Sequence, residues 1–568
     1  MKALPLALAA ALVLPGLAAA EPDPAPIPVT IEVDTARDEG PVEPVWRFFG
    51  ADEPNYATMK DGRTTLATLG ALAPDRVYFR THNLFTSGDG TPALKWGSTG
   101  IYREDAQGRP IYDWTIVDRI FDTYRARGVK PYVELGFMPE AMSTKPQPYQ
   151  HDWRPGSGTL RTGWAYPPRD YAKWEELIHQ WVRHCIERYG RAEVASWYFQ
   201  TWNEANLPQY YWGGTREEFF RLHDAAVRGV RRALPEARVG GPDSAGAGDD
   251  FLAAFLAHVK AAGTPTDFLS FHAKGQPVVV EDAQGSHVRM GLKTHLRAAD
   301  HEFAAIAADP DARTKPIIIG ESDPEGCAAC QGPANAYRNG TMYSSYTAAS
   351  FARLRALAAR RGLKLEGILS WAFEFEDQPP FAGFRQLTSG GIDLPVMNMF
   401  KLFAKMRGHY VRATSDHQAP LDTVLSAGVR DTPDIGSVAS LERNTLSILV
   451  WHYHDDDVPG ADAAVALRLR GLPPALAKGA TVTHYRIDAA HSNSFAAWRA
   501  MGSPIAPTDA QRAALLKAGT LATMGATPEP ITAEKAGAAL SFRLPRQGVS
   551  LLVLTPGGGR GGTSEPRR

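Results

Sequence analysis

Eight short apolar runs alternate with longer amphipathic segments between residues 45 and 410, and this alternation constrains the fold more than any other feature of the chain. Each run has the length of a β-strand, whereas most gaps have the period of an amphipathic helix. The runs are 45–50, 76–80, 130–135, 197–202, 238–240, 267–271, 316–319 and 365–371, and the helical segments are 114–127, 170–189, 216–234, 250–262, 293–308 and 334–361. Eight strands that alternate with helices predict an α/β fold, a (β/α)8 TIM barrel over residues 45–410.

A second domain is predicted after the barrel, over residues 411–555. The runs 445–451, 464–469, 482–487 and 549–554 alternate with period 2, which indicates an accessory β-sandwich. Residues 27–33 alternate in the same way, so we expect the segment 21–44 to pair with this sandwich. The Gly- and Arg-rich residues 556–568 predict a disordered tail.

The first twenty residues have the pattern of an export signal. Lys2 precedes an apolar run that ends at Leu17, and three alanines up to Ala20 form a small-residue cleavage site. We therefore expect cleavage near Ala20 and a secreted or periplasmic protein. No later apolar stretch approaches the roughly 20 residues that span a bilayer, so we expect no membrane partner.

Composition argues against some partners and is compatible with a carbohydrate ligand. The 61 Lys and Arg residues balance 62 Asp and Glu residues, so the chain lacks the basic excess of a nucleic-acid-binding protein. The 13 Trp and 19 Tyr residues provide flat faces on which sugar rings can stack, although most of them should lie in the core.

Two clusters raise the question of metal or redox chemistry. Cys327 and Cys330 form a Cys-x-x-Cys pair, for which we expect a local disulfide in an oxidising compartment, with a redox motif or a zinc site as alternatives. Cys185 lies in a helical segment and should be buried. The run His452-Tyr-His-Asp-Asp-Asp457 suggests calcium or zinc but lies at a strand end in the second domain. We expect neither a metal nor another cofactor.

Two glutamates at strand ends are the strongest catalytic candidates. The run 197–202 leads directly into Asn203 and Glu204, and the run 316–319 is followed by Glu321. A (β/α)8 barrel carries its chemistry at the carboxyl ends of its strands, and retaining glycoside hydrolysis needs two carboxyl groups about 5 to 5.5 Å apart. We assign Glu204 as the acid/base and Glu321 as the nucleophile. We expect a second carboxylate and an aromatic pocket to raise the pKa of Glu204.

Neighbouring polar residues complete the predicted site. Asn203 is suited to hold a sugar 2-hydroxyl, with a helix cap or turn as the alternative. Arg80 is suited to bind the nucleophile, with an ion pair in the barrel core as the alternative. Further candidates for substrate binding at strand ends are His82, His272, Trp371 and Glu374. The histidines are equally compatible with a structural role, and Glu134, Glu376 and Asp377 compete for the acidic roles.

These motifs resemble glycoside hydrolase family 39 from about residue 45 to residue 504. The similar segments are 79–85, 112–122, 133–139, 202–207, 267–272, the strand ending in Glu321, Trp371 with its acidic loop, 488–493 and 501–504. Ala205 replaces the usual proline after the acid/base residue. The resemblance implies a retaining exo-glycosidase with a (β/α)8 barrel, an accessory β-sandwich and no catalytic metal.

The resemblance implies two classes of substrate. Segments 207–214 and 136–139 are similar to those of β-xylosidases, whereas 272–275 and 321–324 are similar to those of α-L-iduronidases, in which the lysine contacts the uronate carboxylate. Lys274 is therefore either a substrate contact or a surface lysine at a strand end. We expect a β-D-xylosidase acting on xylo-oligosaccharides, with a uronidase or another pentosidase such as an arabinobiosidase as the alternative. A carbohydrate-binding protein without catalysis is the alternative from another class.

Overall fold

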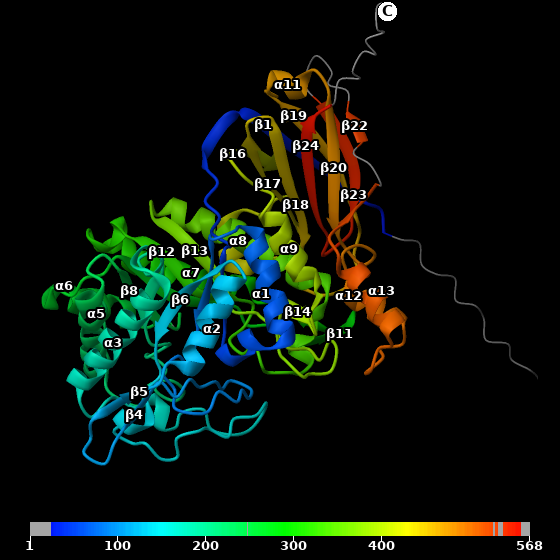
Figure 1. Cartoon of the computed structure of the whole chain (residues 1–568). Helices are drawn as coiled ribbons and strands as arrows, with labels where there is room; N and C mark the ends of the chain where they lie inside the picture. Colours follow the sequence, from blue (N-terminus) through cyan, green and yellow to red (C-terminus); the bar gives the residue numbers. More distant parts are fainter. Residues whose placement is uncertain (1–23, 247, 526–528, 532–537, 558–568) are drawn as a thin grey trace, which may run out of the picture.

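A computed structural model of the chain describes residues 24–246, 248–525, 529–531 and 538–557. The expected export signal at 1–20 and residues 558–568 of the expected disordered tail lie outside these ranges, so both expectations stay predictions. The described residues form a barrel and a separate β-sheet domain beside it (Figure 1). The described helices include none that is both long and apolar enough to cross a membrane.

Eight parallel strands close into the predicted barrel. Their order around it is β12, β13, β2, β3, β6, β7, β8 and β9. Their bounds are β2 Phe48–Ala51, β3 Val77–Thr81, β6 Val129–Leu135, β7 Tyr198–Thr201, β8 Arg238–Ser244, β9 Phe268–Lys274, β12 Pro316–Asp323 and β13 Lys364–Ser370. Each strand overlaps one of the eight predicted runs, and the prediction of a TIM barrel is confirmed.

Aromatic side chains fill the amino-terminal end of the barrel. The ring centroids of Phe48 and Tyr78 lie 5.1 Å apart, those of Tyr78 and Tyr198 4.9 Å, and those of Tyr132 and Tyr198 5.7 Å. Phe268 packs on Tyr198 at 5.2 Å. Phe48, Tyr198 and Phe268 begin their strands, and Tyr132 pairs with Tyr198 in the register of the barrel. The packed layer therefore leaves the carboxyl ends as the place for a ligand.

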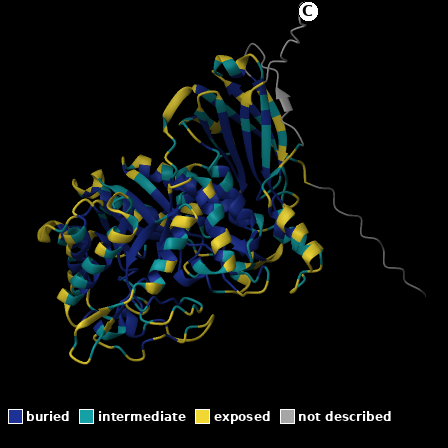
Figure 2. Cartoon of the chain, viewed as in Figure 1, coloured by how far each residue is buried: buried dark blue, intermediate teal, exposed yellow. Residues whose placement is uncertain are grey.

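Helices surround the barrel and turn their buried faces toward it (Figure 2), and the apolar residues of these faces belong to the same core as those of the strands. Their bounds are α1 Lys60–Leu72, α2 Thr115–Ala126, α3 Tyr171–Tyr189, α5 Arg216–Ala233, α6 Phe251–Ala262, α7 Leu292–Ala308, α8 Thr341–Arg360 and α9 Pro395–Phe403. Helix α5 begins with a capping box between Thr215 and Glu218. Gly229 lets α3 approach α5 closely, because a Cβ there would lie 2.5 Å from the carbonyl oxygen of Glu175.

The second domain is one mixed ten-stranded sheet within the described ranges, folded around its own apolar core as the predicted β-sandwich. Its strands are β1 Ile27–Pro41, β16 His409–Ser415, β17 Asp434–Glu442, β18 Thr445–Tyr453, β19 Ala463–Arg470, β20 Ala480–Ile487, β21 Ala522–Thr523, β22 Glu529–Ile531, β23 Ala538–Leu544 and β24 Val549–Pro556. Strand β1 pairs antiparallel with β16 and parallel with β19, so the beginning of the described chain lies inside the sheet.

The run 452–457 links the two domains. Asp456 forms an ion pair with Arg289 of the β11 strand (Gly285–Arg289), with Arg289 Nη2 3.0 Å from Asp456 Oδ2. His452 Nδ1 lies 3.0 Å from the Leu544 carbonyl, and the Asp455 carboxylate accepts hydrogen bonds from Tyr453 and Val429. These side chains have protein partners, so the geometry does not favour the metal interpretation of the run.

Candidate active site

The turn after β7 places Glu204 at the mouth of the barrel. Trp202 and Glu204 both have left-handed backbone conformations, with φ of 68° and 44°. Such conformations cost free energy and persist where surrounding packing enforces them. Trp202 is fully buried, packs on Phe137 with ring centroids 5.0 Å apart, and donates its indole N–H to the Tyr211 carbonyl. The Glu204 N–H donates to the Asp243 carbonyl of β8 at 3.0 Å.

Glu321 comes from β12, on the side of the barrel next to β9. It stands opposite His272 in the register of these strands, directly after a register shift. Gly320 leaves space for a buried carboxylate behind it, because a Cβ there would lie 2.0 Å from Asp243 Oδ1. The local backbone therefore brings Glu321 and Asp243 to the same depth of the barrel.

One ammonium group joins the two predicted catalytic carboxylates. Lys274 Nζ lies 2.7 Å from Glu204 Oε1 and 2.6 Å from Glu321 Oε2. His272 Nδ1 lies 2.8 Å from Glu204 Oε1, and its Nε2 lies 3.1 Å from Asp243 Oδ2. One oxygen of each glutamate and a nitrogen of His272 all lie within 4.8 Å of one another. The structure thus brings together four residues that the sequence analysis selected separately.

The electrostatics of Glu204 differ from the expectation. Burial alone would raise its pKa, but the charge of Lys274 and the hydrogen bond from His272 outweigh burial and lower the pKa. The pKa of Glu321 is lowered too, because Lys274 and His272 outweigh its burial. Burial would lower the pKa of His272, but Glu321 and Asp243 raise it to about 9. The expectation of a raised pKa at Glu204 was wrong, since it omitted the cations beside it.

Arg80 fulfils both of the roles considered for it. Its side chain is fully buried, with Nη1 3.2 Å from Glu321 Oε1 and Nη2 2.5 Å from Asp243 Oδ2 and 2.9 Å from Glu134 Oε2. Nη2 also donates to Asn203 Oδ1 at 2.9 Å. Arg80 therefore forms ion pairs with Asp243 and Glu134 in the barrel core and also contacts the predicted nucleophile, Glu321.

This contact orients the amide of Asn203. With Oδ1 occupied by Arg80, Nδ2 is buried and has no hydrogen-bond partner among the described residues. An unpartnered buried donor is costly unless a ligand binds it. Asn203 thus offers two N–H groups beside Glu204.

His82 and Trp371 pack beside the buried charged residues of the site. His82 Nδ1 lies 3.1 Å from Asp52 Oδ1 and its Nε2 3.2 Å from Glu134 Oε2. The ring of Trp371 lies 4.5 Å from that of His82 and 5.0 Å from the Arg80 guanidinium carbon. Both are nearly fully buried, so in this structure they position other groups.

Glu374 does not join this cluster. Its carboxylate accepts hydrogen bonds from Thr388 Oγ1 and from the N–H groups of Gly390 and Gly391, at 2.5, 3.1 and 3.2 Å. Burial raises its pKa to about 8. The prediction that Glu374 contacts substrate finds no support in its position, because all of these partners belong to the hairpin of β14 (Thr388–Ser389) and β15 (Ile392–Asp393).

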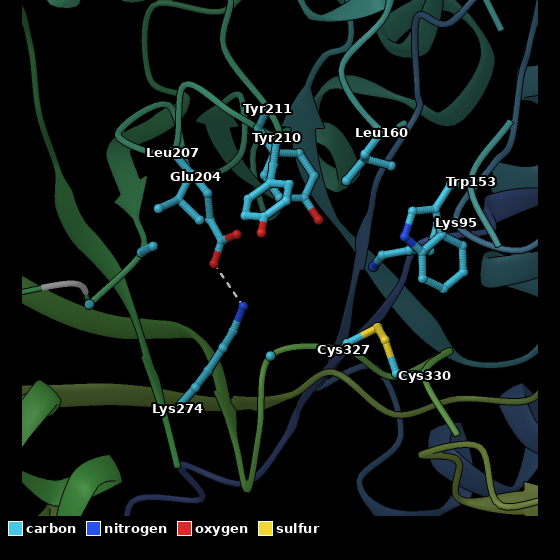
Figure 3. Close-up of a pocket in the computed structure, with 13 residues that line it drawn as sticks. Lys95, Trp153, Leu160, Glu204, Leu207, Tyr210, Tyr211, Lys274, Cys327 and Cys330 are labelled. Carbon is cyan, nitrogen blue, oxygen red and sulfur yellow. Dashed lines mark hydrogen bonds and ion pairs between the residues drawn. A yellow bond between two sulfur atoms is a disulfide. The ribbon is translucent and has the colours of Figure 1, made fainter. Parts of the chain in front are cut away.

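A cavity of about 410 Å³ opens beside Glu204 and Lys274 (Figure 3). Its lining residues are Lys95, Trp153, Leu160, Glu204, Leu207, Tyr210, Tyr211, Ala245, Gly246, Lys274, Gly326, Cys327 and Cys330. Cys327 and Cys330 form a disulfide, and it lies in the cavity wall. Lys95, Trp153 and Leu160 were not predicted from the sequence, because they lie in long connections that carry no strand-end signal.

Glu204, His272 and Glu321 are the group of possible metal ligands that the described residues bring together. The Lys274 ammonium, however, lies between the two carboxylates and within hydrogen-bond distance of both. A protein cation therefore already compensates the charges that a metal ion would bind.

Comparison with known proteins identifies the family of the chain. The family model described as "Glycosyl hydrolases family 39" matches residues 29–532. The chain belongs to glycosyl hydrolase family 39. It is accordingly a glycosidase that hydrolyses O-glycosyl compounds, and the resemblance noted in the sequence is confirmed.

Three similar proteins carry two different activity names. A β-xylosidase of Geobacillus stearothermophilus is 37% identical over 199 residues, 34% of this chain and 36% of that protein. A β-xylosidase of Caldicellulosiruptor saccharolyticus is 27% identical over 428 residues, 74% of this chain and 79% of that protein. The α-L-iduronidase of Homo sapiens is 25% identical over 580 residues, 92% of this chain and 78% of that protein.

A solved GH39 enzyme from Xanthomonas axonopodis pv. citri shares the fold. It superposes with a TM-score of 0.72 at 23% identity, over 95% of this chain and 100% of the other.

Proposed function

We propose that the protein is a retaining, exo-acting glycosidase, with Glu321 as nucleophile and Glu204 as acid/base. The observation that carries this proposal is the spacing of the two carboxylates, whose nearest oxygens lie within 4.8 Å. Retaining enzymes hold these groups about 5 to 5.5 Å apart, whereas inverting enzymes need about 6.5 to 9.5 Å to admit a water. Exo action is supported by the cavity beside Glu204, whose wall includes the disulfide and Trp153.

The surrounding residues support a double displacement. Arg80 keeps Glu321 ionised, so its carboxylate can attack the anomeric carbon. Asn203 donates from Nδ2 to the sugar 2-hydroxyl, a contact that strengthens in the transition state. Glu204 gives its proton to the leaving oxygen and later removes one from the water that releases the sugar.

Lys274 has to move before this reaction begins. Its ammonium lies between the two carboxylates, where the scissile bond must enter. Once the ammonium leaves, Glu204 loses the charge that lowers its pKa and can hold the proton that an acid catalyst needs.

We take a β-D-xyloside at the end of a xylo-oligosaccharide as the substrate. This choice is supported by the two bacterial relatives named β-xylosidase, one of which matches at 37% identity. The aromatic side chains of Trp153, Tyr210 and Tyr211 in the cavity wall suit the faces of a neutral sugar.

An α-L-iduronide-like uronoside is the second candidate, and the position of Lys274 favours it. When Glu204 takes up its catalytic proton, Lys274 loses one of its two carboxylate partners. A carboxylate on the sugar would replace that partner and draw the ammonium out of the reaction path. A neutral xyloside offers no such replacement.

Initial rates on an aryl β-D-xyloside and an aryl α-L-iduronide, measured at several pH values, separate the two substrates. If the wild-type protein prefers the xyloside, Lys274→Met should lower kcat/KM on it only modestly. If it prefers the iduronide, the same variant should lower kcat/KM on that substrate by roughly 100-fold or more. Hydrolysis of neither by the wild-type protein would contradict both substrate assignments.

Two further variants test the catalytic roles. Glu321→Gln should lose roughly 10⁴-fold or more in kcat, whereas a carbohydrate-binding protein without catalysis would bind sugar as before and show no turnover to lose. Glu204→Gln should retain activity on aryl glycosides with good leaving groups and lose it on oligosaccharides, because only poor leaving groups need a proton. Equal losses on both substrates would contradict the acid role.

A further inference from the structure

Lys95 is a second ammonium group in the wall of the catalytic cavity, and the sequence analysis did not select it. Lys95 and Trp153 lie on the side of the cavity away from Glu204 and Lys274 (Figure 3). The Lys95 side chain is 9% exposed, and its Nζ lies 3.0 Å from Asp52 Oδ2. A buried ammonium is costly unless it is paired, and Asp52 supplies that pair.

The backbone of Lys95 is held in place from both sides. The residue has φ of 59°, a left-handed conformation that is uncommon outside glycine, in the turn between Ala93 and Trp96. Its N–H donates to Glu53 Oε1 at 2.6 Å, and its carbonyl lies 2.9 Å from His151 Nε2. The structure thus fixes where this ammonium is presented.

The hydrogen bonds of Lys95 are incomplete. Asp52 is the one acceptor that the described residues place within reach of Nζ. An ammonium group has three N–H donors, so two remain for a ligand in the cavity. Asp52 is itself held by His82 Nδ1 at 3.1 Å, so the pair is rigid.

The barrel order places this donor at the far end of a bound sugar. Asp52 follows β2, which lies across the closed barrel from β8, whereas Glu204 is hydrogen-bonded to β8. A sugar with its anomeric carbon between Glu204 and Glu321 therefore directs its opposite ring carbons toward the β2 side.

We propose that Lys95, anchored by Asp52, donates hydrogen bonds to a ring hydroxyl remote from the scissile bond, at carbon 3 or 4, and thereby selects the configuration of that hydroxyl. Because the carboxylate of Asp52 already balances the charge of Lys95, a neutral hydroxyl suits it better than an anionic group. This inference rests on the proposed glycosidase site and adds a specificity residue to it.

A double-change cycle, in which the Lys95 side chain and one substrate hydroxyl are removed separately and together, tests the assignment. Wild type and Lys95→Met are compared on the preferred aryl glycoside and on its 3-deoxy and 4-deoxy analogues. A hydrogen bond from a charged donor predicts a loss of roughly 10- to 100-fold in kcat/KM on the complete sugar. On the analogue that lacks the contacted hydroxyl, the two proteins should differ by less than about threefold.

The control is Lys173→Met, which removes a lysine on the protein surface whose Nζ lies 2.7 Å from Glu104 Oε1. It should leave all three substrates unaffected. Equal losses for Lys95→Met on all three sugars would assign Lys95 a purely structural role and overturn the proposal, as would no loss on any. Should Lys95→Met fail to fold because it leaves the buried Asp52 carboxylate unpaired, the double variant Asp52→Asn, Lys95→Met, which removes that charge as well, takes its place in the same cycle.

Calorimetric binding of the free monosaccharide and its deoxy forms separates this proposal from the catalytic one. If the wild-type protein binds sugar without hydrolysing it, the catalytic assignment fails while the same binding cycle still decides the role of Lys95. If it hydrolyses the glycoside but the cycle shows no coupling, only the role of Lys95 fails.

Discussion

Replacing Lys274 by Met should shift the whole pH profile of the enzyme upward. Lys274 Nζ lies 2.7 Å from Glu204 and 2.6 Å from Glu321, and its charge lowers the pKa of both. Removing a cation from beside a carboxylate raises its pKa, and the two carboxylates left facing each other raise it further. Both limbs of the bell-shaped profile therefore move in the same direction.

The size of this shift follows from Coulomb's law. Two unit charges about 4 Å apart interact by about 4 kcal/mol at an effective dielectric constant of about 20, which corresponds to roughly three pKa units. Water that enters the space of the lost ammonium screens part of this energy. We therefore expect the apparent pKa values of the carboxylate pair to rise by at least about one unit.

The assay is kcat/KM against pH, which reports the groups of the free enzyme, on the neutral aryl glycoside that the wild-type protein hydrolyses fastest. Lys274→Arg keeps the charge and should keep the wild-type profile, so it serves as the matched control. A Lys274→Met profile within about 0.3 pH units of the wild-type profile would refute the electrostatic reasoning.

Two predictions concern stability. Burial raises the pKa of Glu374 to about 8 in the folded protein. The protonated carboxyl therefore contributes fully to the free energy of unfolding below about pH 4.5. This contribution is lost by about 1.4 kcal/mol per pH unit as the pH rises to about 8. Glu374→Gln should flatten that dependence in urea unfolding at pH 5 and 8, and an unchanged slope would contradict it. The disulfide closes a loop of only four residues, so Cys327→Ser with Cys330→Ser should lower the free energy of unfolding by no more than about 2 kcal/mol. In this double variant Arg338 still donates hydrogen bonds to the carbonyls of Cys327 and Ala328, which keep the loop in place. A loss of unfolding free energy clearly above about 2 kcal/mol would contradict the prediction and show that the disulfide stabilises contacts beyond its own loop.

The sequence predicted the barrel well because its strands are buried on both faces. The run 130–135, for example, became β6 Val129–Leu135, and 365–371 became β13 Lys364–Ser370. The prediction at 238–240 was too short, since Gly241 and Pro242 resemble a turn although β8 continues to Ser244. Asp243, which binds Arg80 and His272, was therefore missed.

The sequence by itself determined which strands carry a glutamate near or just beyond their carboxyl ends, and thus which two carboxylates can meet at the barrel mouth. Strand ends are encoded locally, by apolar runs that stop at polar residues. Only the tertiary structure decided the charge state of that pair. Lys274 reaches Glu204 and Glu321 from a third strand, so its effect depends on distances between segments far apart in the chain. Electrostatic energies follow such distances and the exclusion of water, and no local sequence pattern contains either.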